Sequence, residues 1–262
     1  MKLNVFTFGA ALVMATGWAG APAGAAELDS LKQQLTDADD EKAADAAKKL
    51  GESGDAKAID VILDALAVGA PPHVQAVLLG DLAGKKDARA VEVLKHYTRN
   101  RNPELRKKAV IALAELADAR AVPALIAALS DPVEDVRGAA ALALGKRKER
   151  SAIEPLVKLL EHKDAAAATA LAQLATPELA HRMAEMIGRV PDALLCSALG
   201  EMLKRPDFGP EPIRVEVVKT LSKVPGIDST SVLIEYVAAT EKDKMRPSRV
   251  EAQKIVDQRS GQ

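Results

Sequence analysis

The sequence repeats one short phrase at a nearly constant spacing, and this period constrains the fold more than any other feature. The phrase begins with an acidic residue and ends with alanine and a β-branched residue. Its copies span residues 55–59, 87–91, 118–122 and, as the loosest match, 149–153. From one copy to the next, the first residue advances by 32, 31 and 31 positions. Such a period predicts one supersecondary unit that recurs along the chain.

A second series keeps the same step and predicts that each unit holds two helices. Its members are Val74-Gln75, Leu105-Arg106 and Val136-Arg137. In the clearest unit, apolar residues of 122–129 follow helical spacing, Ser130-Asp131-Pro132 ends that helix and starts the next, and Gly145 is expected to end the second helix. Neither helix can bury its apolar stripe alone. Stacked units therefore predict an all-α solenoid of about six or seven two-helix repeats wound as a right-handed superhelix.

Two stretches carry a resemblance to a known family. They are Asp-Ala-Arg-Ala-Val-Pro-Ala-Leu-Ile-Ala-Ala-Leu (residues 118–129) and Asp-Pro-Val-Glu-Asp-Val-Arg-Gly-Ala-Ala-Ala-Leu-Ala-Leu-Gly (residues 131–145). At these residues the sequence resembles the HEAT-repeat family, specifically the short HEAT-like repeats of phycobilisome lyase proteins. The match is strong over residues 55–161 and extends over 28–258. It is specific for the fold and implies no particular activity.

The first 25 residues have the pattern of a secretory signal peptide. Lys2 precedes an apolar run, and a stretch rich in Gly, Ala and Pro follows before charge resumes at Glu27. This order predicts cleavage after Ala25 or Ala26 and a periplasmic or extracellular protein. We expect no membrane span once the signal is removed. Of the six aromatic residues, three lie in this segment, including the single Trp18, so recognition by aromatic stacking is not expected.

The phase of the repeat divides the remaining chain into three parts. Residues 26–54 are expected to form N-terminal capping helices, residues 55–161 regular repeats, and residues 162–262 irregular repeats with a charged C-terminal cap. Between residues 177 and 212 the phase is lost, and residues 205–212 predict a longer loop. After that loop, Ile213-Arg214 has the pattern of a second helix of a unit rather than a first.

Polar residues at repeated positions form the first set of candidate sites. An arginine follows the start of the second helix, and an Asn or Asp lies six residues before it. In one unit these two positions hold Gly69 and Gln75, so both the turn Asn or Asp and the arginine are absent there. We expect a structural ladder in which the turn residue caps a helix and pairs with an arginine of its own or an adjacent unit. The ladder candidates are Asn100, Arg106, Asp131 and Arg137.

The charge distribution supplies the candidates for binding. The net charge is −1, but residues 27–64 carry 11 acidic and 5 basic side chains, whereas residues 85–108 carry 9 basic and 3 acidic ones. A basic band running from residues 99–108 to residues 146–150 would suit an acidic protein segment or an anionic envelope polymer. A solvated face is the plainer interpretation. The protein-binding candidates, on a concave surface of second helices, are Gln75, Arg106, Lys107, Arg137 and Gly138.

The sequence contains no catalytic motif that we recognise. HEAT-repeat hydroxylases, which resemble this fold, carry His-Glu pairs, yet none of the four histidines here precedes a glutamate. HExxH, GxSxG, GxGxxG and P-loop patterns do not occur. Cys196 is interpreted as a small buried residue. We expect no cofactor and no catalytic or metal-binding residue, and the alternative is a transition-metal site between repeats involving His162 or His181.

These observations favour a non-enzymatic scaffold or adaptor of the bacterial envelope that binds another protein. The partners that we expect include proteins that present an acidic segment. The balanced charge and the lack of aromatic residues among the basic ones argue against nucleic acid. Two alternatives stay open: an enzyme or enzyme subunit with a metal or cofactor site between repeats, and a structural accessory for envelope assembly. Neither the partner nor the oligomeric state follows from the sequence.

Overall fold

The structure, a computed structural model, describes residues 24–261. Within this range the chain is helical and forms no β-sheet, which confirms the predicted all-α solenoid of stacked repeats. The predicted signal peptide lies outside the described residues, except for the cleavage positions at Ala25 and Ala26, which fall in the first turn of α1. None of the described helices is both long and apolar enough to cross a membrane.

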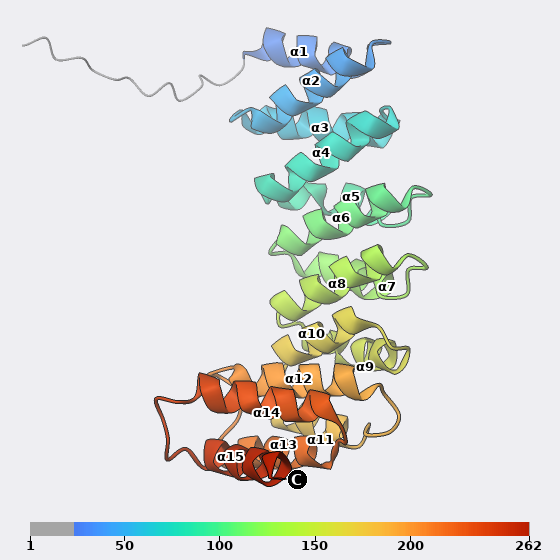
Figure 1. Cartoon of the computed structure of the whole chain (residues 1–262). Coiled ribbons are helices and arrows are strands. Elements are labelled where there is room, and N and C mark those ends of the chain that lie inside the picture. The colour runs from blue at the N-terminus through green and yellow to red at the C-terminus, as the bar shows by residue number, and fades with distance from the viewer. Residues whose placement is uncertain (1–23, 262) are drawn as a thin grey trace, which may run out of the picture.

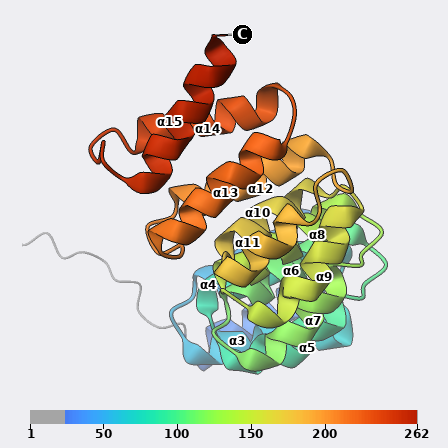
Figure 2. The same ribbon diagram turned by 90° about the horizontal axis from the view of Figure 1, so that it is seen from below.

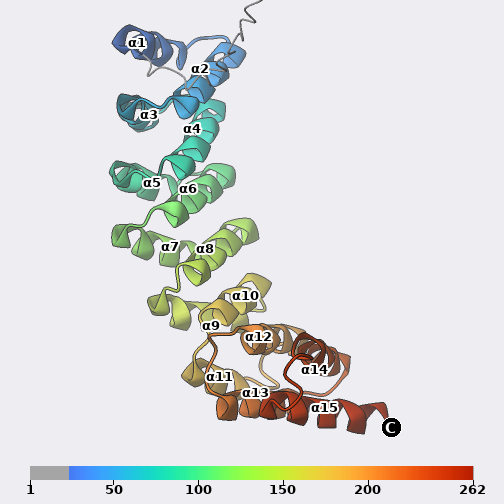
Figure 3. The same cartoon turned by 90° about the vertical axis from the view of Figure 1, so that its left-hand side faces the viewer.

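Five helix pairs form a regular stack (Figure 1). The pairs are α1 (Ala25–Gln34) and α2 (Asp40–Glu52), α3 (Ala56–Val68) and α4 (Pro72–Lys85), α5 (Val91–Tyr97) and α6 (Pro103–Glu115), α7 (Val122–Ala128) and α8 (Glu134–Lys146), and α9 (Ile153–Glu161) and α10 (Ala165–Gln173). Short 3₁₀ helices, η1 (Ala88–Ala90), η2 (Ala119–Ala121) and η3 (Arg150–Ala152), precede α5, α7 and α9. The even-numbered helices pack on one another along the stack, and the odd-numbered helices form a second layer beside them (Figure 3).

The acidic residue of the repeated phrase caps α3 and each of the 3₁₀ helices η1, η2 and η3 that lead into α5, α7 and α9. The carboxylate of Asp55 accepts a hydrogen bond from the Lys57 N–H at 2.8 Å, and Asp118 accepts one from the Arg120 N–H at the same distance. The side chain of Arg120 also donates to Asp118, and these bonds lower the pKa of Asp118 to about 2. A side chain that satisfies a free N–H group at a helix start explains why an acidic residue recurs at this position.

Alanine and leucine fill the space between the layers. The fully buried residues of α8 include Ala140, Ala141 and Leu144, and corresponding small and large residues line α6 and α10. Gly145 is buried inside α8 and does not end it, contrary to our expectation. A Cβ at Gly145 would lie 3.0 Å from Cα of Ala170, so glycine allows α10 to pack closely, and Lys148 (φ 53°) makes the turn instead.

Prolines mark the start of some second helices but not all. Asn102 caps α6 and Thr176 caps α11, each directly before a proline at the first helical position. In contrast, α8 begins at Glu134, two residues after Pro132. The carboxylate of Asp131 accepts a hydrogen bond from the Val133 N–H at 2.9 Å, so Asp131 stabilises an extra turn ahead of α8.

The remaining helices change the direction of stacking. They are α11 (Pro177–Ala184), α12 (Asp192–Lys204), α13 (Glu211–Lys223), α14 (Ile227–Ala239) and α15 (Pro247–Ser260). Figure 2 looks along the regular stack, and helices α12 to α15 extend sideways from it. Helix α12 packs on α10 and α14 on α12, while α13 packs against α11 and α15. The expectation that α13 is a second helix is therefore wrong for its layer, because α12 and α14 continue the layer of second helices from α10, and α13 packs with α11 and α15 instead.

Candidate protein-binding surface

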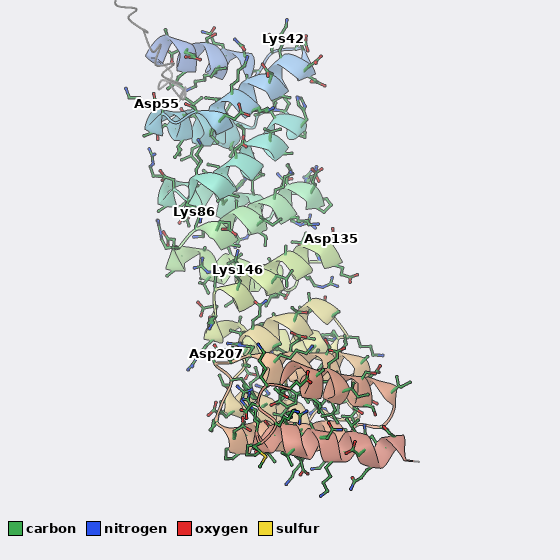
Figure 4. All side chains as sticks on the ribbon, turned by 60° about the vertical axis from the view of Figure 1, so that its left-hand side comes forward. Lys42, Asp55, Lys86, Asp135, Lys146 and Asp207 are labelled. Carbon is green, nitrogen blue, oxygen red and sulfur yellow. The ribbon has the colours of Figure 1, made fainter. Side chains whose placement is uncertain are left out.

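The turns that join odd-numbered to even-numbered helices lie along one edge of the stack, which we call the turn edge. It comprises residues 99–102, 130–133 and 162–164. In Figure 4, Asp135 marks the side of the stack where the turn edge lies, and Lys86, Lys146 and Asp207 mark the opposite side. Most of the candidate residues lie at or beside the turn edge.

Arg106 connects two consecutive repeats. Its Nε and Nη2 donate to the two carboxylate oxygens of Asp131 at 2.7 and 2.8 Å, a bidentate pair between α6 and the next turn. Its Nη1 also donates to the carbonyl oxygens of Asn100 and Arg101 at 3.0 and 3.2 Å. A planar guanidinium that satisfies a turn and a carboxylate at once fixes the spacing between repeats.

Arg137 makes the equivalent connection one repeat later. Its Nε donates to Oδ2 of Asp164 at 2.9 Å, and its Nη1 donates to the carbonyl oxygens of Asp131 and Pro132 at 3.0 and 3.2 Å. Asp164 in turn caps α10 by accepting a hydrogen bond from the Ala166 N–H. We refer to the two pairs, Arg106–Asp131 and Arg137–Asp164, as the arginine ladder.

The ladder runs from each arginine to the acidic residue of the following repeat. Gln75 occupies the arginine position in α4, and its amide donates only to the Ala70 carbonyl, at 2.6 Å. The following turn has Asn100 in place of an acid, and the side chain of Asn100 accepts a hydrogen bond from the Asn102 N–H. At this step both the arginine and the acid are thus replaced by neutral residues, which leaves no unpaired buried charge.

The ladder side chains are shielded from solvent. The side chains of Arg106 and Asp131 are 12% and 7% exposed, and those of Arg137 and Asp164 are 23% and 4% exposed. Burial alone would raise the pKa of Asp131, but the hydrogen bonds from Arg106 and from the Val133 N–H hold it below its ordinary value. Asp131 therefore stays ionised, and these arginines are occupied by contacts within the chain.

The other candidates lie on the exposed face of the even-numbered helices. Lys107 of α6 pairs with Asp135 of α8 at 2.7 Å, and Gly138 lies beside Ala166 of α10. On the same helices Ile111 and Leu142 are 44% and 47% exposed. The structure thus separates Lys107 and Gly138 on this face from Gln75, Arg106 and Arg137 at the turn edge.

The expected basic band is divided between two edges. Residues 99–108 lie at the start of α6, whereas residues 146–150 follow the end of α8, on the edge where Figure 4 marks Lys146. Several of these cations are already paired. Lys146 lies 3.2 Å from Glu115, and Lys148 lies 3.0 Å from Asp207. A single band joined along the array is therefore not present.

Two sets of structural residues were missed by sequence reasoning. Asp164 lies 33 residues after Asp131, two more than the 31-residue period, so its position does not coincide with a repeated one in the sequence. At the edge opposite the turn edge, Arg147 donates to the carbonyl oxygens of Leu116 and Asp118, and Arg205 donates to that of Ala172. These cations satisfy free carbonyls at the ends of α6 and α10, where positive charge is favoured by the helix dipole.

Two hollows lie beside the turn edge on the side of the odd-numbered helices. One, of about 770 Å³, lies between α5 and α7 and includes Lys95, Arg99 and Pro123 in its lining. The other, of about 780 Å³, lies between α7 and α9 and includes Ile126, Pro155 and Lys158. Arg106 and Arg137 of the ladder each contribute to one hollow.

The histidines and the cysteine do not assemble into a site in the described residues. No group of three His, Cys, Asp or Glu side chains suited to a metal ion occurs between residues 24 and 261. His181 lies 2.9 Å from Glu216, and its contacts with the Pro177 carbonyl and with Glu216 raise its pKa. Cys196 is 1% exposed, and burial raises the pKa of its thiol to about 11.

Comparison with known proteins supports a repeat family for part of the chain. Residues 62–142 and 91–176 match the family model described as HEAT repeats, which supports the predicted family over this part of the chain. No curated protein matches the sequence. The repeats extend across the helices that carry the arginine ladder.

Solved structures with a similar arrangement include natural and designed proteins. The complex of CpcE and CpcF of phycocyanin lyase from Nostoc sp. PCC7120 is 19% identical, with 98% of this chain and 99% of that chain covered and a TM-score of 0.48. Human deoxyhypusine hydroxylase in complex with glycerol is 20% identical, with 90% and 97% covered and a TM-score of 0.41. A designed armadillo repeat protein in complex with the peptide (KR)4 is 17% identical, with 88% and 98% covered and a TM-score of 0.39.

Proposed function

We propose that this chain, whose residues 62–176 match HEAT repeats, is a non-enzymatic scaffold of the bacterial envelope that binds an acidic segment of another protein. The observation that carries the proposal is the turn edge. There the arginine ladder holds consecutive repeats in register, and Arg99 and Arg101 are exposed and lie within 4 Å of no carboxylate of the described residues. A stiff surface with uncompensated positive charge suits a partner of opposite charge.

The internal ion pairs separate the arginines that stabilise the stack from those that are available to a partner. Arg106 and Arg137 are committed to the ladder, so they position the surface rather than meet a partner. Arg99 and Arg101 lie in the turn whose carbonyl oxygens Arg106 binds. These hydrogen bonds hold the backbone of the turn that carries the exposed cations, which reduces the backbone entropy lost on binding.

Binding to charged side chains of this kind is expected to depend on salt. We expect a partner captured from the envelope fraction by the full chain to dissociate as the salt concentration rises from 50 to 500 mM, because screening shortens the range of the charges. The variant Arg99→Glu/Arg101→Glu is expected to lose the partner. Lys254→Glu in α15, a cation on an exposed helix far along the chain, is the matched control. Capture that resists salt and survives both reversals would contradict the proposal.

The compartment and the lack of catalysis are tested separately. N-terminal sequencing of the protein from the periplasmic fraction is expected to begin at Ala26 or Glu27, and a chain that begins at Met1 in the cytoplasm would contradict an envelope role. Metal analysis of the purified protein is expected to find no stoichiometric iron or zinc. Bound metal that is lost in the His162→Ala or His181→Ala variant would instead favour an enzyme.

A further inference from the structure

We propose that the two hollows beside the turn edge form one groove that binds an acidic segment in an extended conformation. The inference rests on the proposed function and specifies both the place and the shape of the bound segment. We call this site the outer groove. It runs across α5, α7 and α9 on the side of the odd-numbered helices.

The two hollows are continuous because they share part of their lining. Ala127 and Ser130, at the end of α7, line both of them and are exposed. Small side chains at this junction make a low ridge between the hollows. The regular stack places equivalent surfaces one repeat apart, so a segment that leaves the first hollow over this ridge enters the second.

Charge decides what the outer groove would bind. Its lining contains four carboxylates, and each of them is already in an ion pair within the chain. Glu92 pairs with Lys95, Asp131 with Arg106, Asp164 with Arg137 and Glu154 with Arg182. The lining cations Arg99 and Lys158 are exposed and have no carboxylate within 4 Å in the described residues. The lining of the first hollow therefore holds one more cation than carboxylates, whereas the charges of the second hollow balance and Lys158 is its exposed cation outside any ion pair of the described residues.

The walls of the groove add an apolar contribution. Pro123 and Ala124 contribute to the first hollow, and Ile126 and Pro155 contribute to the second. An acidic segment with proline or aliphatic residues between its carboxylates would place apolar groups on these walls and carboxylates near Arg99 and Lys158. Each apolar contact removes surface from water and supplements the charge attraction.

The continuity of the two hollows favours an extended backbone over a helix. The hollows share Ala127 and Ser130, and an extended chain, which advances about 3.3 Å per residue, passes from one hollow to the other within a few residues. A helix is about 10–12 Å across with its side chains and rises only about 1.5 Å per residue, so it needs a wider channel and about twice as many residues to cover the same length. An extended segment of about six to eight residues can instead enter both hollows.

A peptide titration tests the inference with the full chain. The probe is fluorescein-labelled (Glu-Pro)4, which favours an extended conformation, and the matched neutral peptide is (Gln-Pro)4. At low salt we expect saturable binding of the acidic probe, measured by fluorescence anisotropy, and at least tenfold weaker binding of the neutral one. Arg99→Glu and Lys158→Glu are each expected to weaken binding about threefold to fivefold, and the double variant at least tenfold.

Two controls separate the outer groove from other surfaces. Lys107→Glu on the even-numbered helices and Lys254→Glu in α15 are expected to leave the affinity within twofold of the unchanged protein. Circular dichroism melts verify that all variants fold. Arg99→Gln, which removes the charge without reversing it, is expected to have an effect between those of the unchanged protein and Arg99→Glu.

The outcomes distinguish this inference from the proposed function. If (Glu-Pro)4 binds but responds only to Lys107→Glu, the outer groove is wrong while a charged protein-binding scaffold is retained. If a helical acidic peptide of equal charge binds more tightly than (Glu-Pro)4, the extended conformation is wrong. If neither peptide binds, the outer groove is overturned, and the salt-dependent capture experiment alone decides the proposed function.

Discussion

The regular stack and the C-terminal helices use the same residue type in different ways. In the stack, Arg106 connects a turn to an aspartate of the next repeat at a partly exposed edge. In the C-terminal helices, Arg214 is 2% exposed and donates to the carbonyl oxygens of Leu203 and Arg205 at 2.6 and 2.7 Å, at the end of α12 and the start of the loop that follows it. The difference shows two roles for an arginine. It stabilises the register between repeats where the next repeat supplies a carboxylate, and it stabilises a single irregular loop where only nearby carbonyl oxygens accept its hydrogen bonds.

The surroundings of the two arginines explain this difference. The loop between α12 and α13 places Phe208 under Arg214, with the guanidinium carbon 5.5 Å from the ring centroid. The carboxylate near Arg214 belongs to Glu211 of its own helix, 3.8 Å from Nε. Glu211 also accepts hydrogen bonds from Arg246 and Ser248 and ties α13 to the start of α15. The C-terminal helices thus close on themselves, whereas the stack is held by contacts between neighbours.

The largest effect is expected from Arg214. In Arg214→Met, the carbonyls of Leu203 and Arg205 lose their donor inside the protein, so we expect the free energy of unfolding to fall by about 3 kcal/mol. Urea denaturation followed by circular dichroism measures this. Arg106→Met leaves the 7% exposed carboxylate of Asp131 without its partner but frees carbonyls of an exposed turn, and it is expected to cost about 2 kcal/mol. Equal losses in the two variants would show that the two arginines do not differ as we describe.

The second effect concerns close packing between neighbouring even-numbered helices. In Gly145→Ala the new Cβ would lie 3.0 Å from Cα of Ala170, and backbone cannot move aside easily, so we expect a loss of about 1–2 kcal/mol. In Gly138→Ala, between the same two helices, the nearest atom would be Cβ of Ala166 at 3.7 Å, an ordinary contact, and the loss should be smaller. Thermal denaturation of both variants measures the difference. A larger loss for Gly138→Ala would reverse this comparison.

The third effect is the pH dependence of the arginine ladder. The pKa of Asp131 is lower in the folded chain than in the unfolded one, so its contribution to stability is present above about pH 4 and is lost as the pH falls further. We expect Asp131→Asn to be about 1 kcal/mol less stable at pH 7 and to approach the unchanged protein near pH 2. Denaturation at a series of pH values tests this. A difference that is constant with pH would mean that ionised Asp131 does not contribute.

The smallest effect is expected from Gly84, where there is open space for an added methyl group. No atom lies within 4 Å of a Cβ placed at Gly84 in α4. Gly84→Ala should therefore stabilise the chain by roughly 0.5–1 kcal/mol through helix propensity alone. A shift in the thermal midpoint measures it, with Gly145→Ala as the opposite case. Destabilisation by Gly84→Ala would indicate a contact that the packing of α4 does not include.

The sequence predicts the regular part of this fold better than its end, for a physical reason. Each regular repeat contacts only its neighbours, so a local phrase such as residues 118–122 determines both a helix cap and its place in the stack. The pattern of Ile213-Arg214 matches a second helix in one local respect, because Arg214 donates to backbone carbonyl oxygens ahead of its helix as Arg106 does. It does not predict the layer of α13, because that depends on how the short α11 packs.

The candidate surface was only partly accessible from the sequence. The repeat period indicated that Arg106, Arg137 and Asp131 occupy related positions. It did not show whether each arginine pairs with the acid of its own repeat or of an adjacent repeat, because the period is the same in both directions along the chain. Asp164 was missed because its turn is longer. The outer groove depends on the relative placement of α5, α7 and α9 and on which carboxylates are already paired, and neither is encoded in a local pattern.

Photo-crosslinking of an acidic peptide to the full chain tests the central claim most directly. A (Glu-Pro)4 peptide with a diazirine group at its centre would be bound, irradiated and mapped by mass spectrometry. We predict crosslinks in residues 92–100, 123–132 and 154–164, which line the outer groove, with competition by unlabelled (Glu-Pro)4. Crosslinks concentrated in α12 to α15, or on the even-numbered helices around Ile111 and Leu142, would contradict the account.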